Sequence, residues 1–171
     1  MTLRVGTKVI YPSQGPCLIG SIVQKEIGGN AVSFYQLALL DESGGELFVP
    51  VAKAQASGLR QLLSKAELPR LLALFQQPPG VIKDWKQRAS ENAKRLASGS
   101  AFDLAEVVKS LTELSEKKEL SFPESRVLDK ARRLLISELA EVLKEPKSAA
   151  EARLDQALNV RKPAPEAARQ A

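Results

Sequence analysis

The 171-residue chain contains no histidine and a single cysteine, Cys17. Without imidazole side chains it cannot build a Ser-His-Asp triad, a Cys-His dyad or a histidine-ligated metal site. One cysteine forms neither an internal disulfide nor a thiolate zinc cluster. We therefore predict a protein that is not an enzyme, with no catalytic residues, no cofactor and no metal.

Long apolar runs are also missing. No run approaches the roughly 18 residues that a membrane-spanning helix needs, and residues 1–8 carry no signal-peptide core. These absences predict a cytoplasmic protein without membrane contact. Apolar residues still make up 44% of the chain, which is enough for a folded core. The net charge of +5 permits a nucleic-acid partner without requiring one.

The glycine pairs of the chain do not form a phosphate-binding loop. Gly28-Gly29 and Gly44-Gly45 separate predicted strands, whereas a phosphate loop connects a strand to the N-terminus of a helix. Acidic residues are scattered along predicted helix faces, with no sign of the pocket that paired catalytic carboxylates need. We therefore expect the glycine pairs to form turns and the acidic residues to lie on solvated helix faces.

The first 55 residues have the pattern of a small β-structure. Apolar residues predict short strands within 5–11, 18–27, 32–40 and 47–49. Turn-forming segments lie between them, and Gly28-Gly29-Asn30 supplies the positive φ angles of a hairpin turn. Four or five short strands with such turns predict a small, bent antiparallel β-barrel over residues 1–55.

From about Gly58 onward the apolar spacing becomes helical. Helices are predicted over about 64–77, 84–98, 101–114, 121–145 and 148–159. Gly99 is placed to supply the left-handed residue that ends the second of them. The predicted fold class is therefore α+β, in which the β-barrel is followed by a compact all-α domain over 56–159. A disordered tail is predicted over 160–171.

Two capping boxes mark helix starts. Ser64 is followed by Glu67, and Ser121 is followed by Glu124, so each serine can cap a helix while the glutamate bonds back to it. Pro69 would fall in the second turn of the first helix, where a proline is unfavourable. The sequence leaves this conflict open.

Two basic clusters lie in the predicted helical domain, and each has a net charge of +3. They occupy residues 83–95 and 126–133 on two different helices. Together they would present a basic surface to a nucleic acid. Charge alone favours ordinary solvated helix faces, because clusters of this size are common and nucleic-acid sites usually carry more.

Trp85 is the only tryptophan and lies within the first basic cluster. At 100° per residue it lies about 40° from Ala89 and about 20° from Leu96, in line with the apolar stripe of its helix. This spacing favours a tryptophan in the core. The alternative is an exposed ring at a helix N-terminus that stacks on or wedges beside a base while cations hold phosphates.

Residues 5–15 read VGTKVIYPSQG, and further diagnostic segments follow in a fixed order along the chain. These segments are 33–35, 49–51, 57–60, Trp85, 96–100, 104–108, 120–122, 128–132 and 135–139. Together they resemble the CarD/CdnL family of bacterial transcription regulators. The similarity extends over residues 4–143 and therefore covers both predicted domains.

The resemblance implies a Tudor-like N-terminal domain that binds the β subunit of RNA polymerase. It also implies a helical domain that contacts promoter DNA at the upstream edge of the bubble, where the family tryptophan wedges into the minor groove and stabilises the open complex. The predicted DNA-binding residues are Trp85, Lys86, Arg88, Lys94, Arg95, Arg126 and Lys130. The predicted polymerase-binding residues are Lys25, Phe48, Val49 and Pro50. We expect a monomer.

The chain also departs from the family pattern. The family commonly follows its tryptophan with two basic residues and a tyrosine, whereas residues 86–90 read KQRAS here. Ser125 replaces a residue that is often basic, and Phe48 lies in a strand that often carries an arginine. A second hypothesis is therefore a protein-interaction adaptor of the same fold that has weakened or lost DNA binding. Enzymatic activity is the third.

Overall fold

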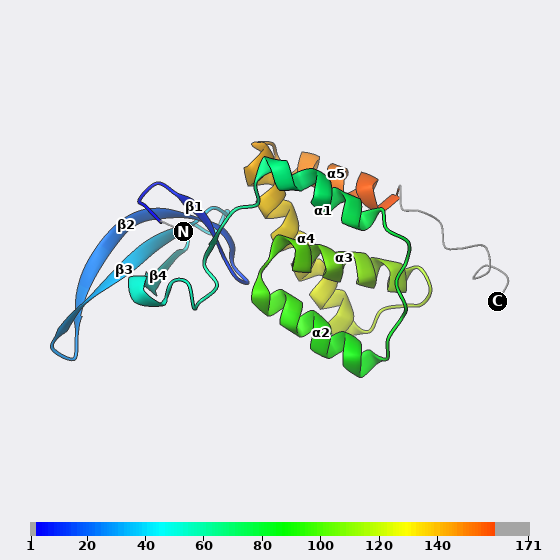
Figure 1. Cartoon of the computed structure of the whole chain (residues 1–171), viewed down its shortest axis with the longest axis horizontal. Helices are drawn as coiled ribbons and strands as arrows, with labels where there is room; N and C mark the ends of the chain where they lie inside the picture. Colours follow the sequence, from blue (N-terminus) through cyan, green and yellow to red (C-terminus); the bar gives the residue numbers. More distant parts are fainter. Residues whose placement is uncertain (1–2, 160–171) are drawn as a thin grey trace. The chain divides into compact units, whose positions relative to one another are not determined.

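The computed structural model describes residues 3–159 of the chain (Figure 1). They form two compact units, of which the first ends at Leu62 and the second begins at Leu63. The first contains a five-stranded antiparallel sheet and the second contains five α-helices, which confirms the predicted α+β class. The tail predicted over 160–171 lies outside the described residues.

The sheet has the strand order β4-β3-β2-β1-β5, so β4 and β5 are its edges. The strands are β1 (Lys8–Tyr11), β2 (Gly15–Ile27), β3 (Asn30–Leu39), β4 (Glu46–Pro50) and β5 (Arg60–Gln61). The first four correspond to predicted strands. The short polar β5 has no apolar alternation to predict it, and it pairs with Val9 and Ile10 of β1. This pairing extends the first unit beyond the boundary expected at residue 55.

One face of the sheet forms the core of the first unit. Alternation along β3 places Tyr35 and Leu37 in this core and turns Phe34 and Gln36 to the opposite face. A register shift between Ile19 and Ser21 interrupts the pairing of β2 with β3. Such a bulge increases the local twist, which agrees with the curvature of the β2–β3 hairpin (Figure 1).

The five helices begin and end close to their predicted limits. They are α1 (Leu68–Phe75), α2 (Trp85–Ser98), α3 (Ala101–Ser115), α4 (Phe122–Leu143) and α5 (Lys147–Asn159). Ser121 caps α4 by accepting a hydrogen bond from the Glu124 amide, and Gly99 ends α2 with a left-handed φ of 67°. Within residues 3–159, no helix is both long and apolar enough to cross a membrane.

The conflict raised by Pro69 disappears in the structure. The capping box of Ser64 and Glu67 starts a 3-10 turn over Lys65–Glu67, and α1 begins only at Leu68. Pro69 therefore lies in the first turn of α1 instead of the second turn of a longer helix. Backbone N–H groups in the first turn have no acceptor within the helix, so the proline costs no helical hydrogen bond there.

Helix α3 packs against α1, α2 and α4, and α4 also packs against α5. Buried side chains at helical spacing fill these contacts, including Leu104, Val108 and Leu111 on α3. Helix α2 differs from the others, because Asn92 is its only buried side chain among the described residues. Few core contacts therefore attach α2 to the helical unit.

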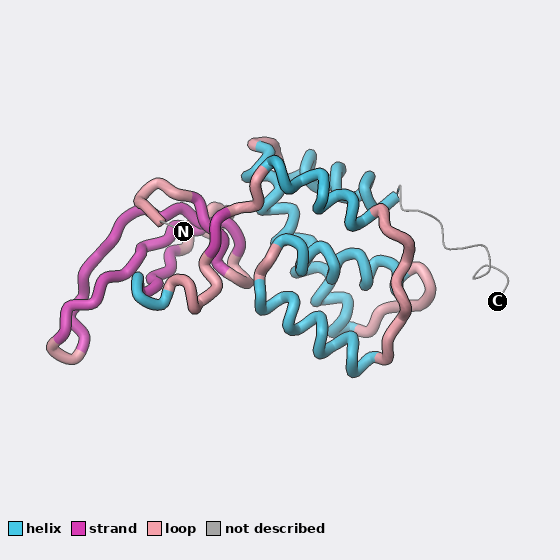
Figure 2. The backbone as a smooth tube through the Cα atoms, viewed as in Figure 1, coloured by secondary structure: helices cyan, strands magenta, loops and turns pink. Residues whose placement is uncertain are grey.

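A loop over residues 76–84 connects α1 to α2 (Figure 2). Lys109 on α3 holds this loop, because its Nζ donates a hydrogen bond of 3.2 Å to the Pro78 carbonyl. The same Nζ lies 2.6 Å from Oε1 of the buried Glu113. The pair fixes the path of the chain that leads to Trp85.

Candidate nucleic-acid interface and sheet surface

Trp85 is the first residue of α2, and 65% of its surface is exposed. The expectation of a core tryptophan is therefore wrong. The predicted angle around the helix was correct, since Trp85 lies in line with the buried Asn92. However, the first turn of α2 contains no buried side chain, so this end of the helix is not packed into the core. Asp84 caps this turn by accepting a hydrogen bond of 2.9 Å from the Gln87 amide.

A second large aromatic side chain is exposed at the start of α4. Phe122 is its first residue and is 73% exposed. Sequence reasoning did not assign a function to Phe122. Helical spacing offered the signal, because Phe122 lies about 180° around the helix from Ala131, which is fully buried. An apolar residue opposite the core stripe is expected to face solvent.

Each exposed ring has a cation beside it. The Nζ of Lys86 lies 5.8 Å from the centroid of the Trp85 ring. The guanidinium carbon of Arg126 lies 5.6 Å from the centroid of the Phe122 ring. Both cations are themselves exposed. The two helix ends therefore carry the same combination of an aromatic face and a positive charge.

Arg88 joins the first turns of α2 and α4. Its Nε donates to Oε2 of Glu124 at 3.0 Å, and its Nη2 donates to Oε1 of the same carboxylate at 3.3 Å. A third bond of 2.7 Å runs from Nη1 to the Lys83 carbonyl. The hydrogen bonds from Arg88 hold the pKa of Glu124 below its usual value. Arg88 was predicted as a phosphate contact, and in the structure these three bonds engage its guanidinium within the protein.

The other predicted DNA-binding cations lie farther along the helices. Lys94 and Arg95 are near the C-terminal end of α2, and Lys94 is about 14 Å along the helix axis from Trp85. Nη1 of Arg95 donates to the Asn92 side chain at 3.4 Å. Lys130 and Arg126 line a shallow hollow of about 420 Å³. Its other lining residues are Leu96, Val127, Asp129 and Arg133.

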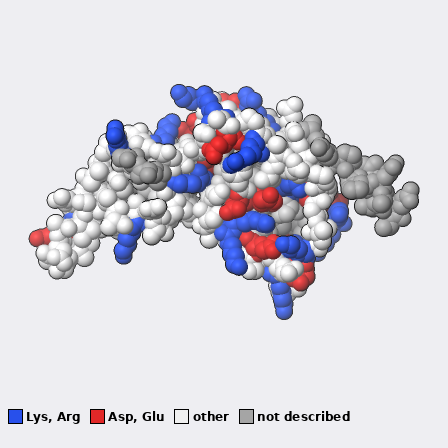
Figure 3. Space-filling view, in the orientation of Figure 1, with Lys and Arg blue, Asp and Glu red and all other residues white. Residues whose placement is uncertain are grey.

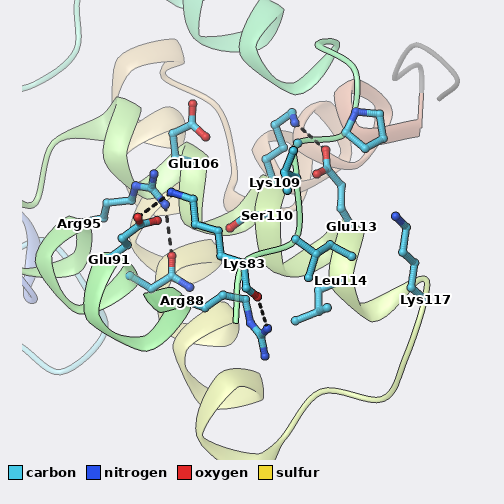
Figure 4. A pocket seen from close by; sticks show the side chains of 15 residues that line it. Lys83, Arg88, Glu91, Arg95, Glu106, Lys109, Ser110, Glu113, Leu114 and Lys117 are labelled. Atoms are coloured by element: carbon cyan, nitrogen blue, oxygen red, sulfur yellow. Dashed lines mark hydrogen bonds and ion pairs between the residues drawn. The ribbon is translucent and has the colours of Figure 1, made fainter. Parts of the chain in front are cut away.

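A separate pocket of about 260 Å³ lies between α2, α3 and the 76–84 loop (Figure 4). Cations and carboxylates around it pair with each other. Lys83 bonds to Glu91 at 2.6 Å and lowers the pKa of that carboxyl, while Lys109 pairs with Glu113. Within residues 3–159, no group of three or more acidic or cysteine side chains is placed to share a metal ion.

Charge is distributed differently over the two units. In the face shown in Figure 3, the first unit is largely uncharged, whereas basic and acidic side chains alternate over the helical unit. The interspersed acidic groups agree with the ion pairs of Arg88 and Lys83. Much of the positive charge counted in the sequence is therefore neutralised locally.

The outer face of the sheet brings together a cation and two aromatic rings, which we call the Lys25 patch (Lys25, Phe34 and Phe48). The Nζ of Lys25 lies 4.1 Å from the Phe48 centroid and 5.8 Å from that of Phe34. Phe48 is 43% exposed on the edge strand β4. Pro50 pairs with Phe34 and is half-buried next to the patch.

Val49 has a different orientation from its neighbours on β4. It pairs with Tyr35, belongs to the core cluster and is only 4% exposed. The prediction of Val49 as a polymerase contact therefore needs correction for its side chain. Alternation along the strand turns the side chain of Phe48 outward and that of Val49 inward.

Comparison with known proteins covers both units. Residues 3–63 match the family model "CarD-like/TRCF RID domain", and residues 70–155 match "CarD, C-terminal domain". YdeB of Bacillus subtilis (strain 168), described as a transcription factor, is 30% identical over 142 residues, which cover 82% of this chain and 92% of YdeB.

The chain is also similar to a solved structure, that of the 72-residue N-terminal domain of Myxococcus xanthus CarD, determined by NMR in solution. The two are 37% identical over 34% of this chain and 77% of that domain. Their TM-score is 0.30.

Proposed function

Since the chain belongs to the CarD-like family of transcription regulators, we propose that it binds RNA polymerase through its sheet and promoter DNA through its helical unit. The single observation that carries the DNA-binding part is the exposure of Trp85 at the start of α2, next to Lys86. An exposed ring of this size is otherwise unfavourable in water.

In the proposed mechanism, Trp85 inserts beside a base step at the upstream edge of the promoter bubble. Its ring replaces part of the stacking that the opened bases lose, so the open complex is held longer. Lys86 and Arg126 bind phosphates nearby, and such contacts position the ring without reading sequence. Phe122 adds a second apolar surface at the adjoining helix end. Lys94, Arg95 and Lys130 extend the contact along the DNA backbone.

The proposed polymerase contact is the open edge at β4 together with the Lys25 patch. A strand of the polymerase β subunit pairs with β4 through main-chain hydrogen bonds, as in other complexes formed by strand addition. Phe48 and Lys25 then provide selectivity. Binding to polymerase places the helical unit at a high local concentration near the promoter, so weak DNA affinity is sufficient. We further propose that the protein acts in the cytoplasm, as a monomer on each polymerase.

The adaptor hypothesis keeps the polymerase contact and removes the DNA contact. One observation favours it: Arg88 is engaged within the protein and Ser125 is uncharged, so fewer cations surround Trp85 than the sequence count implies. The two hypotheses differ in whether the helical unit protects promoter DNA.

A footprint of polymerase on a weak promoter separates the two hypotheses. We expect the protein to add protection at the upstream edge of the bubble, and a Lys86→Ala/Arg126→Ala variant to lose it while staying bound to polymerase. A photoreactive residue introduced at Phe48 should crosslink to the β subunit. Polymerase binding without added protection would support the adaptor instead, and absence of polymerase binding would reject both.

A further inference from the structure

We propose that Arg88 and Glu124 form a clamp that positions Trp85 and Phe122 as one rigid surface, and that Arg88 binds no phosphate. This inference rests on the proposed contact of the helical unit with DNA. It assigns a positioning role to Arg88 and a favourable role to Glu124, an acidic residue beside a surface that binds an anion.

The first argument is the weak attachment of α2 to the core. Asn92 is the only buried side chain among the described residues of α2, and it lies two turns after Trp85. The end that carries Trp85 is therefore not held by apolar packing. Polar contacts must fix its position, and the bonds made by Arg88 are the ones that reach another helix from this turn.

The second argument is the geometry of the clamp. Two donors of the guanidinium meet the two oxygens of the Glu124 carboxylate at 3.0 and 3.3 Å, an arrangement that fixes orientation as well as distance. The side chains are only 13% and 17% exposed, so water and salt screen this pair less than an exposed one. It is therefore stronger than a typical surface ion pair.

The third argument is the additional bond to the Lys83 carbonyl. This bond of 2.7 Å ties the end of the 76–84 loop to α2 directly before the Asp84 cap (Figure 4). One side chain thus joins the loop, the first turn of α2 and the first turn of α4. Trp85 and Phe122 stand at the starts of those two helices, so the clamp sets the position of one ring relative to the other.

Rigidity at this point favours binding. A ring that is already fixed loses less conformational freedom when it inserts between bases than a ring on a fraying helix end. The clamp therefore increases DNA affinity although Glu124 itself repels phosphates. If Glu124 acted only through its charge, its removal would increase DNA affinity. If it acts by positioning the rings, its removal decreases DNA affinity, so the two roles can be told apart.

The test compares Glu124→Gln with Glu119→Gln, which removes the same charge from an exposed residue just before α4. Affinity for a fork-junction promoter DNA is measured over a range of salt concentrations. We expect Glu124→Gln to bind about tenfold more weakly than wild type with an unchanged salt slope, and Glu119→Gln to bind at least as tightly as wild type. Tighter binding by Glu124→Gln would overturn the clamp.

Arg88 is tested with a loss variant and a charge-swap variant. Arg88→Ala should weaken binding to the same extent as Glu124→Gln while leaving the salt slope unchanged. A drop in slope of about 0.9 would identify Arg88 as a phosphate contact and overturn the proposal. The double variant Arg88→Glu/Glu124→Arg keeps the net charge and restores an ion pair, so its affinity should return to within about threefold of wild type.

A measurement without DNA separates failure of the clamp from failure of the proposed function. Trp85 is the only tryptophan, so the decay of its fluorescence anisotropy reports the local motion of this helix end in addition to the tumbling of the protein. We expect faster local motion in Glu124→Gln and Arg88→Ala and normal values in the charge swap and in Glu119→Gln. Unchanged anisotropy in both clamp variants would overturn the proposal, even if wild-type protein bound no DNA.

Discussion

The ammonium group of Lys25 lies 4.1 Å from the centroid of the Phe48 ring, although β3 separates their two strands in the sheet. Phe34 on β3 lies between them in the strand order, and its ring centroid is 5.8 Å from the same Nζ. The contact covers part of the exposed ring and keeps the charge of Lys25 over an apolar surface. The outer face of the sheet therefore offers a partner an aromatic platform with a fixed positive charge.

Phe48→Ala should weaken binding to RNA polymerase about tenfold, because aromatic residues at the centre of an interface typically contribute more than 1 kcal/mol. Lys25→Ala should weaken it about threefold. Equilibrium binding to purified polymerase measures both. Ile27→Ala, which changes an exposed apolar residue near the tip of the hairpin, serves as the control and should bind normally. Normal binding by Phe48→Ala would contradict the proposed polymerase contact.

Lys86→Ala and Arg126→Ala should each reduce the salt slope of DNA binding by about 0.9, because each removes one phosphate contact. Both side chains are exposed beside an aromatic ring. Lys147→Ala removes an exposed cation at the start of α5 and should leave the slope unchanged. If all three variants lowered the slope equally, binding would depend on overall charge and the proposed site would be wrong.

The thiol of Cys17 should resist alkylation in the native protein. It is buried in the sheet core, and burial raises its pKa to about 11. At pH 8 about one thiol in a thousand is then ionised, and the thiolate is the reactive species. Labelling with iodoacetamide should be negligible until denaturant unfolds the sheet. Rapid labelling without denaturant would show that the core is open.

Glu138→Ala should lower the free energy of unfolding of the helical unit by about 3 kcal/mol. Glu138 is 1% exposed, and its Oε2 accepts a hydrogen bond of 2.8 Å from the Leu63 amide, which a truncated side chain leaves without its acceptor. Urea unfolding followed by helical circular dichroism measures the change. Asp129→Ala, an exposed acidic residue of the same helix, should have little effect. Equal losses of unfolding free energy in Glu138→Ala and Asp129→Ala would contradict a structural role for this hydrogen bond.

Signals that act over three or four residues predicted much of the fold. The Ser121 cap starts α4, and Gly99 ends α2, because both depend on backbone geometry next to the residue itself. The pairing of β5 with β1 could not be predicted, because the two polar residues Arg60 and Gln61 show no alternation of apolar and polar residues.

The candidate site was harder to predict than the elements that form it. The helical angle of Trp85 pointed to the core, but an angle does not show where along a helix the packing stops. The partner of Arg88 is Glu124, which is 36 positions away on another helix. The sequence therefore grouped Arg88 with the predicted DNA-binding cations around Trp85, whereas the tertiary structure pairs it within the protein.

The lifetime of the open complex with Trp85→Ala tests the central claim most directly. Polymerase, a weak promoter and each protein variant are mixed, competitor is added, and the dissociation of open complexes is followed. Loss of a stacking ring worth about 1–3 kcal/mol should shorten the lifetime about tenfold relative to wild type, while Trp85→Phe retains part of the effect. The variant should keep normal thermal stability and polymerase binding, because the side chain is 65% exposed. Equal lifetimes for wild type and Trp85→Ala would contradict the account.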